Sequence, residues 1–285
     1  MFRRIKSGWQ LTRKSWGVLR SEPGLIRFPV VGGLISLLLA AIFFVPAAYL
    51  VDSDPTWAGV VLFAIGVYLL AFVGYYFSVG LAANADARMR GERVSFGAGM
   101  SVASSRMSEV AGWAFVATVV MTIIRAIQER LGIAGAVFGA LAAAGWALIS
   151  FLAVPVIAIE GTGPIETIKR CAHLLKSRWG EQITGNVAIG GAVFLIGVLP
   201  AILLIVGGIA LVATTAAGGG ALIAIGVVVL IIAMLIQQAL SVIFGVALYR
   251  YTADGEAVGA FTEQEMEQAV RVKKGHGGAA PAGSI

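Results

Sequence analysis

The chain has 285 residues, of which 59% are hydrophobic and only 13% are charged, whereas about a quarter of the residues of a soluble domain are charged. Together with a mean hydropathy of +0.91, this composition excludes a soluble protein and predicts an integral membrane protein. The net charge of +6 comes from cations placed between apolar segments. Attraction to anionic lipids explains this excess better than nucleic acid does, so we expect the lipid bilayer as a partner and no nucleic acid.

Six apolar segments reach the roughly 20 residues needed to cross ~30 Å of hydrocarbon. Because their apolar runs are continuous rather than alternating, they predict helices and not the strands of a barrel. The predicted fold class is therefore an all-α integral membrane protein with six transmembrane helices. The expected spans are residues 25–51, 59–83, 110–127, 133–159, 185–213 and 221–249.

The distribution of Lys and Arg predicts the orientation of these spans. Of the 21 cations, 19 precede or open the first span, separate spans two and three or four and five, or follow the sixth. The other three connections hold only Arg125 and Arg130. Because such an excess marks cytoplasmic connections, we expect both termini in the cytoplasm of a multi-pass protein of the bacterial inner (plasma) membrane.

An internal repeat divides the predicted spans into pairs. The segment at 5–17 reads "IKSGWQLTRKSWG" and, aligned without gaps on "IKRCAHLLKSRWG" at 168–180, coincides with it at five positions. A third copy with the same apolar phase follows the second span. Because each copy precedes two spans, we predict three parallel repeats of an interfacial amphipathic helix plus a helical hairpin. They cover about 1–90, 91–162 and 163–252, and together form a six-span domain at 1–252.

The repeated segments have apolar residues at every third or fourth position, which predicts amphipathic helices. At 164–181 the polar arc holds Glu166, Lys169, Arg170, His173 and Ser177. Such a helix either lies in the cytoplasmic lipid interface or forms an elbow that packs on the protein's own spans. The apolar positions are Phe2, Ile5, Trp9, Thr12 and Trp16, then Phe96, Met100, Ala103, Met107 and Val110, then Ile165, Ile168, Ala172, Leu175 and Trp179. The candidate lipid-contact residues are Trp9, Trp16, Lys169, Arg170, Lys176, Arg178 and Trp179.

The chain offers little material for catalysis. His173 and His276 are its only histidines and Cys171 is its only cysteine, whereas an active site or metal centre needs convergent acids, bases or ligands. We therefore expect no catalytic residues, no metal, no cofactor and no enzymatic activity.

Gln237, Gln238 and Ser241 are the candidate polar site inside the membrane, near the middle of span six. An amide left unpaired in hydrocarbon is costly, so both glutamines must face protein or water. Successive helix residues diverge by about 100°, so the two are expected to have different neighbours. They form interhelical hydrogen bonds or line a polar path, and both alternatives stay open.

Charged residues near the span ends are candidate structural polar residues. Arg125 and Glu129 have the spacing of a helical ion pair. Glu160 stands beside a Gly-Pro turn that leads into the basic segment at 164–181. For Glu160 we expect a contact with a helix N-terminus or with a nearby Arg.

The chain after the spans divides into two parts. Residues 253–272 form a short cytoplasmic segment, in which Thr262 and Glu265 have the spacing of a capping box that predicts a helix at 263–271. Residues 273–285 are rich in Gly and Ala, and we expect a disordered tail.

The segments "PVIAIEGTGPIETIKRCAHLLKSRWGE" and "ALYRYTADGEAVGAF" resemble those of an uncharacterised family of six-span bacterial and archaeal membrane proteins, over residues 1 to about 270. The chain is more distantly similar to the membrane domain attached to some glycerophosphodiesterases. That resemblance implies no catalysis, because the catalytic barrel of those enzymes belongs to a domain that this chain lacks.

Two functions are compatible with these observations. The first is a non-enzymatic membrane scaffold that associates with itself, as a homo-oligomer, or holds a partner through its cytoplasmic helices. The second is a transporter or channel for a small or lipidic solute, which would use the glutamines of span six. The scarcity of charge inside the spans favours the first, because ion-coupled transport usually uses buried acids.

Overall fold

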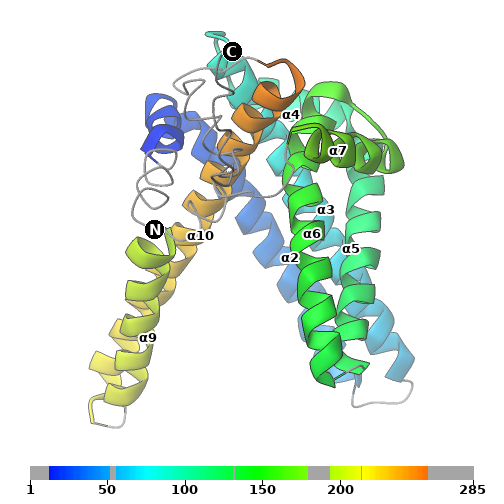
Figure 1. Ribbon diagram of the computed structural model, residues 1–285. Helices are drawn as coiled ribbons and strands as arrows, with labels where there is room; N and C mark the ends of the chain where they lie inside the picture. The colour runs from blue at the N-terminus through cyan, green and yellow to red at the C-terminus, as the bar shows by residue number, and fades with distance from the viewer. Residues whose placement is uncertain (1–12, 52–55, 131, 179–192, 213, 256–285) are drawn as a thin grey trace, which may run out of the picture.

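The computed structural model describes residues 13–51, 56–130, 132–178, 193–212 and 214–255, which are helical apart from short connections and contain no strand. A helix at 13–21, here called the N-terminal helix, comes first. The later elements (Figure 1) are η1 (Pro23–Ile26), α2 (Arg27–Val51), α3 (Thr56–Met89), α4 (Phe96–Ser105), α5 (Met107–Arg130), α6 (Gly132–Glu160), α7 (Pro164–Arg178), η2 (Phe194–Val198), α9 (Leu199–Val212) and α10 (Ala216–Ala253).

Six of these helices are long and apolar enough to cross a membrane, which confirms the prediction of six spans. They pack as three antiparallel hairpins, α2 with α3, α5 with α6, and α9 with α10. The short helices α4 and α7 lie at one end of the molecule, where the C-terminal end of α10 also lies (Figure 1). We call this the α4–α7 end.

Two spans extend beyond their predicted bounds toward the α4–α7 end. With 34 residues in α3 and 38 in α10, and 1.5 Å per residue, these helices are about 51 and 57 Å long, far more than the ~30 Å of hydrocarbon. The extension of α3 past residue 83 carries Asn84, whose Nδ2 donates to the Ser95 carbonyl at 2.8 Å. The helix ends before Gly91, which has φ +81°, a conformation that favours glycine.

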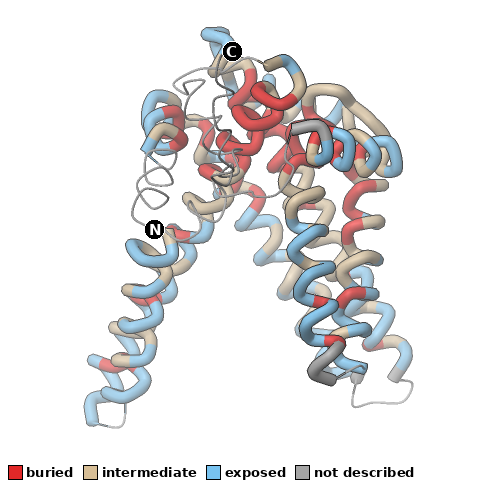
Figure 2. Tube along the Cα trace, viewed as in Figure 1, coloured by how far each residue is buried: buried red, intermediate tan, exposed pale blue. Residues whose placement is uncertain are grey.

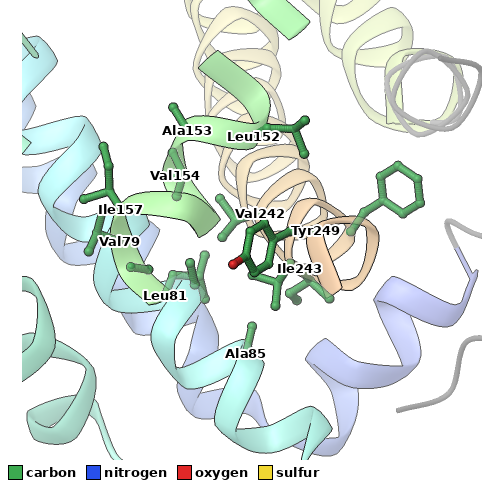
Figure 3. Close-up of a cluster of buried hydrophobic side chains, with 14 of the residues drawn as sticks. Val79, Leu81, Ala85, Leu152, Ala153, Val154, Ile157, Val242, Ile243 and Tyr249 are labelled. Atoms are coloured by element: carbon green, nitrogen blue, oxygen red, sulfur yellow. The ribbon is translucent and has the colours of Figure 1, made fainter. Parts of the chain in front are cut away.

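The buried core lies at the α4–α7 end (Figure 2). It is formed mainly by α3, α6 and the last third of α10, with Leu81, Ile157 and Ile243 almost fully buried (Figure 3). At the opposite end the helices expose large apolar side chains such as Leu37, Phe138 and Leu203. There the α9–α10 hairpin diverges from the other two (Figure 1). Apolar exposure at membrane depth is expected for surfaces that contact lipid.

Helix α7 is the amphipathic helix that the sequence predicts, but its buried face differs from the predicted one. Helix α7 packs against α6 and α5 and buries Thr167, Cys171 and Leu174, whereas Ile165 is 69% exposed and Ala172 is also exposed. Ile165 and Ala172 therefore lie on the side of α7 that does not pack on the spans, whereas Ile168 and Leu175 of the same predicted apolar arc are half-buried against the core. The helix packs on the spans as an elbow, and this packing selects a face that includes the small polar Thr167.

The other two short helices bury some of the predicted apolar positions and expose others. In the N-terminal helix Ser15, Val18 and Leu19 are buried and Trp16 is 42% exposed; the predicted positions before residue 13 lie outside the described residues. In α4, Ala103 is buried as expected. The helix ends at Arg106, so the apolar phase is interrupted and Met107, at the start of α5, is exposed.

Helix α4 lies against α3 at a position where both helices have glycine. A Cβ on Gly99 would lie 2.6 Å from the Gly80 carbonyl oxygen and 2.5 Å from the Phe28 ring, closer than real Cβ atoms approach. Ser95 caps this helix, since its Oγ accepts a hydrogen bond from the Ala98 amide at 3.1 Å. The glycine pair therefore sets the distance between α4 and α3.

We predict that Gly99→Ala destabilises the protein whereas Gly97→Ala does not. Both changes improve helix propensity by up to about 1 kcal/mol, but Gly97 has open space around it. Overpacking at Gly99 costs about 1–3 kcal/mol, because the Gly80 backbone cannot yield easily. Thermal unfolding in detergent measures both variants, and an equal melting temperature for the two would contradict the close packing of α4 on α3.

Candidate functional site

The glutamines of α10 contact different partners. Gln238 Nε2 donates to Ser78 Oγ on α3 at 3.2 Å, and Ser78 Oγ donates to the Gly74 carbonyl at 2.7 Å. This chain of hydrogen bonds joins α10 to α3 within the candidate spans. Each such bond between helices in a bilayer contributes about 0.6 kcal/mol on average.

Gln237 bonds within its own helix. Its Nε2 donates to Ser241 Oγ, one turn further along α10, at 3.3 Å. Its Oε1 is buried and has no hydrogen-bond partner among the described residues. Burying a carbonyl oxygen without a hydrogen bond costs free energy. Gln237 Oε1 would therefore gain stability by accepting a hydrogen bond.

A second polar cluster joins the ends of three helices. Glu160, the last residue of α6, accepts two hydrogen bonds on Oε1: from Tyr249 Oη on α10 at 2.6 Å and from Arg170 Nε on α7 at 2.8 Å. Its side chain is 23% exposed. The turn after it contains Gly161 with φ +66°, which reverses the chain so that α7 brings Arg170 back to Glu160.

This arrangement affects the titration of two groups on α7. The hydrogen bond to Glu160 raises the pKa of the Arg170 guanidinium, so Arg170 is charged at any physiological pH. Burial, and secondarily the negative charge of Glu160, raises the pKa of the Cys171 thiol to about 12. The thiolate is the reactive form of cysteine, and Cys171 is fully buried. Cys171 therefore acts as a packing residue.

A third cluster forms around Asp86 near the end of α3. Its carboxylate, 6% exposed, accepts two hydrogen bonds from Arg250 of α10, Nε to Oδ1 at 2.7 Å and Nη2 to Oδ2 at 2.8 Å. Arg90 Nη2 lies 3.2 Å from Asp86 Oδ2. Arg250 Nη1 also donates to Asp254 at 2.9 Å. Bidentate pairs of this kind are strong and directional, and this one fastens α10 to α3.

The sequence analysis did not identify Asp86, Tyr249 or Arg250 as a site. A signal is present, because Asn84 and Asp86 are polar residues in direct continuation of an apolar span, and Arg250 directly follows another. Asp86 and its partner Arg250 are 164 residues apart in the chain, and Tyr249 and its partner Glu160 are 89 residues apart. No local pattern indicates such pairings.

The remaining candidate residues do not gather at one place. Arg125 and Glu129 are exposed near the other end of α5, and the ion pairs of the described residues do not include them. Lys169 and Lys176 are exposed on α7. Trp9, Trp179 and the side chain of Arg178 lie outside what the structure describes. No group of three His, Cys, Asp or Glu within the described ranges could hold a metal ion.

A protein-family model matches residues 56–259. It is described as a family of unknown function (DUF6159). The chain belongs to this family. The match begins at α3 and includes all three polar clusters, whereas the N-terminal helix, η1 and α2 precede it. No curated protein and no solved structure matches the chain.

We predict that Asp86→Asn lowers stability much more than Asp254→Asn. Both carboxylates accept from Arg250, but Asp86 is 6% exposed and Asp254 is 42% exposed. Removing one partner of a buried pair costs about 3 kcal/mol, while an exposed helical pair contributes about 0.5 kcal/mol or less. Chemical or thermal unfolding in detergent compares them. Similar losses for both variants would show that the Asp86 pair does not hold α10 to α3.

Proposed function

We propose that this protein is a non-enzymatic membrane scaffold that associates with itself. The hydrogen bond between Gln238 and Ser78 carries the proposal, because a polar group at the middle of a span is used to join two of the protein's own helices. A transport path instead requires polar groups that face water or substrate.

The clusters at the α4–α7 end support the same function. Asp86 and Arg250 neutralise each other between α3 and α10, and Glu160 and Arg170 do so between α6 and α7. Each cluster also reaches a helix that is distant in the chain, because Asp86 pairs with Arg250 and Glu160 accepts from Tyr249 of α10. These side chains thus hold the helix ends together as a rigid platform. On this platform, the exposed residues of α7 can contact a partner.

The proposed platform faces the cytoplasm. Cations concentrate at the α4–α7 end, on the N-terminal helix, on α7, at the ends of α3 and α10 and on both sides of α4, at Arg93 and Arg106, whereas Arg125 and Arg130 occupy the other end of α5. An excess of Lys and Arg marks the cytoplasmic side. With each hairpin preceded by a short helix at this end, the chain fits three parallel repeats in a cell membrane. The distant resemblance to the membrane domain of glycerophosphodiesterases also fits a role without catalysis.

The alternative, transport of a small or lipidic solute, has one observation in its favour. Gln237 Oε1 is buried with no partner among the described residues, so it could accept a hydrogen bond from a passing solute. A single acceptor is a weak basis for a path, because selectivity depends on several polar groups lining a pore.

A stability and flux experiment distinguishes the two functions. Gln238→Leu should lower the melting temperature in detergent modestly. The variant loses an interhelical hydrogen bond worth about 0.6 kcal/mol, and it leaves Ser78 Oγ beside an apolar side chain. Gln237→Leu, which loses only an intrahelical bond, is the matched control. In reconstituted vesicles, neither variant nor the native chain should release small solutes. A raised melting temperature for Gln238→Leu, with flux that depends on either glutamine, would favour transport.

Self-association is measured on the same preparation. Subunit counting by single-molecule photobleaching in native membranes should give two or more copies per spot at low expression. Single copies at every expression level would contradict the self-associating scaffold while leaving the topology intact.

For the orientation, we predict that a cysteine at position 129 is labelled from outside intact cells and one at 176 is not. Glu129→Cys and Lys176→Cys place exposed thiols at opposite ends of the molecule, each in a background with Cys171→Ser. A membrane-impermeant maleimide gives the readout, and permeabilised cells, in which both positions should react, give the control. Labelling of 176 alone in intact cells would invert the topology.

A further inference from the structure

A groove runs between the first and the third hairpin at the side of the molecule. Its volume is about 410 Å³, and its walls come from the N-terminal helix, η1 and the start of α2 on one side and from the middle of α10 on the other. The lining includes Trp16, Arg20, Val30, Ile232 and Leu235. The groove therefore reaches from the predicted cytoplasmic surface toward the middle of the membrane.

The deep part of the groove is apolar. Val30 of α2 is 37% exposed and Ile232 of α10 is 51% exposed. They line the groove from opposite walls, and Ile236 lines it on the α10 wall. Next to it the two walls meet, because a Cβ on Gly33 of α2 would lie 3.3 Å from Leu235 Cδ2 of α10. This part fits a hydrocarbon chain, and a polar solute would lose its hydrogen bonds there.

The shallow part of the groove is cationic. Arg20 is the charged residue among those that line it, is exposed, and makes no ion pair with any described acidic side chain. Trp16 lies beside it, and tryptophan favours the membrane–water interface. Residues 13–27 contain four cations, Arg13, Lys14, Arg20 and Arg27, and one acid, Glu22. The segment that forms this wall thus has a net charge of about +3, of which Arg20 lies at the groove.

We propose that this groove binds one anionic phospholipid, with an acyl chain between α2 and α10 and the phosphate at Arg20. The charge and the apolar depth of the groove match the two ends of such a molecule. Guanidinium groups pair strongly with phosphate, and basic residues near a membrane surface attract anionic lipid by about 1 kcal/mol each. The lipid would fill the opening where the α9–α10 hairpin leaves the first hairpin. This site does not depend on whether the protein is a scaffold or a transporter.

Native mass spectrometry of the delipidated full chain in detergent tests the proposal, with phosphatidylglycerol and phosphatidylcholine as probes. The native chain should bind one phosphatidylglycerol more tightly than phosphatidylcholine. Arg20→Gln should weaken phosphatidylglycerol binding about five-fold, as expected for one cation, and leave phosphatidylcholine unchanged. Arg13→Gln is the matched control, since Arg13 is an exposed cation of the same helix that does not line the groove.

A second pair of variants tests the apolar part. Val30→Trp should fill the groove and reduce the retention of both lipids, whereas Leu34→Trp, one turn further along α2, exposed and outside the groove, should reduce neither. Melting temperatures without lipid identify any variant that fails to fold. If the Val30→Trp variant does not fold, Ile232→Trp fills the groove from the opposite wall and gives the same test.

Two outcomes overturn the proposal. Equal losses for Arg20→Gln and Arg13→Gln would show that the cations attract lipid only diffusely. A Val30→Trp variant that retains both lipids but loses self-association would show that a second copy of the chain occupies the groove.

Discussion

A polar group in hydrocarbon has no water to bond with, and this constraint explains where the protein is tightly packed and where it is open. The two buried or half-buried carboxylates near the span ends, Asp86 and Glu160, each have a partner on another helix. Asp86 meets Arg250 across α3 and α10, and Glu160 meets Arg170 and Tyr249 across α6, α7 and α10. The helices converge at these contacts, and the core of Leu81, Ile157 and Ile243 lies beside them.

Away from these contacts, little holds the hairpins together. Apolar side chains gain no advantage from packing on each other rather than on lipid tails, so the outer parts of the helices expose residues such as Leu37 and Leu203. Within the α9–α10 hairpin, Gly208 and Gly219 allow the two backbones to approach closely. The hairpin is thus a tight unit fastened to the rest mainly by the last third of α10. Its divergence creates the groove that we assign to a lipid.

The scaffold proposal and the lipid site are compatible through this geometry. A lipid between α2 and α10 would stabilise the angle between the first and third hairpins, and that angle determines which apolar surfaces a second copy can reach. The exposed part of α7, with Ile165 beside Lys169 and Lys176, adds a cytoplasmic surface that a partner or the membrane surface could contact. Neither the lipid site nor the exposed surface of α7 requires a catalytic residue.

The sequence by itself determined the number and helical nature of the spans and the existence of short helices at α4 and α7, because these depend on local composition and on an apolar period within 20 to 30 residues. It also indicated Glu160 and the two glutamines as candidate polar residues, since isolated polar residues in an apolar segment can be identified without a structure. Only the tertiary structure decided which face of α7 is buried, since Thr167 and Cys171 are buried and Ile165 is exposed. It alone brought Asp86 to Arg250, 164 residues away, because pairing between helices depends on how hairpins are arranged around each other, and no local pattern in the chain records that arrangement.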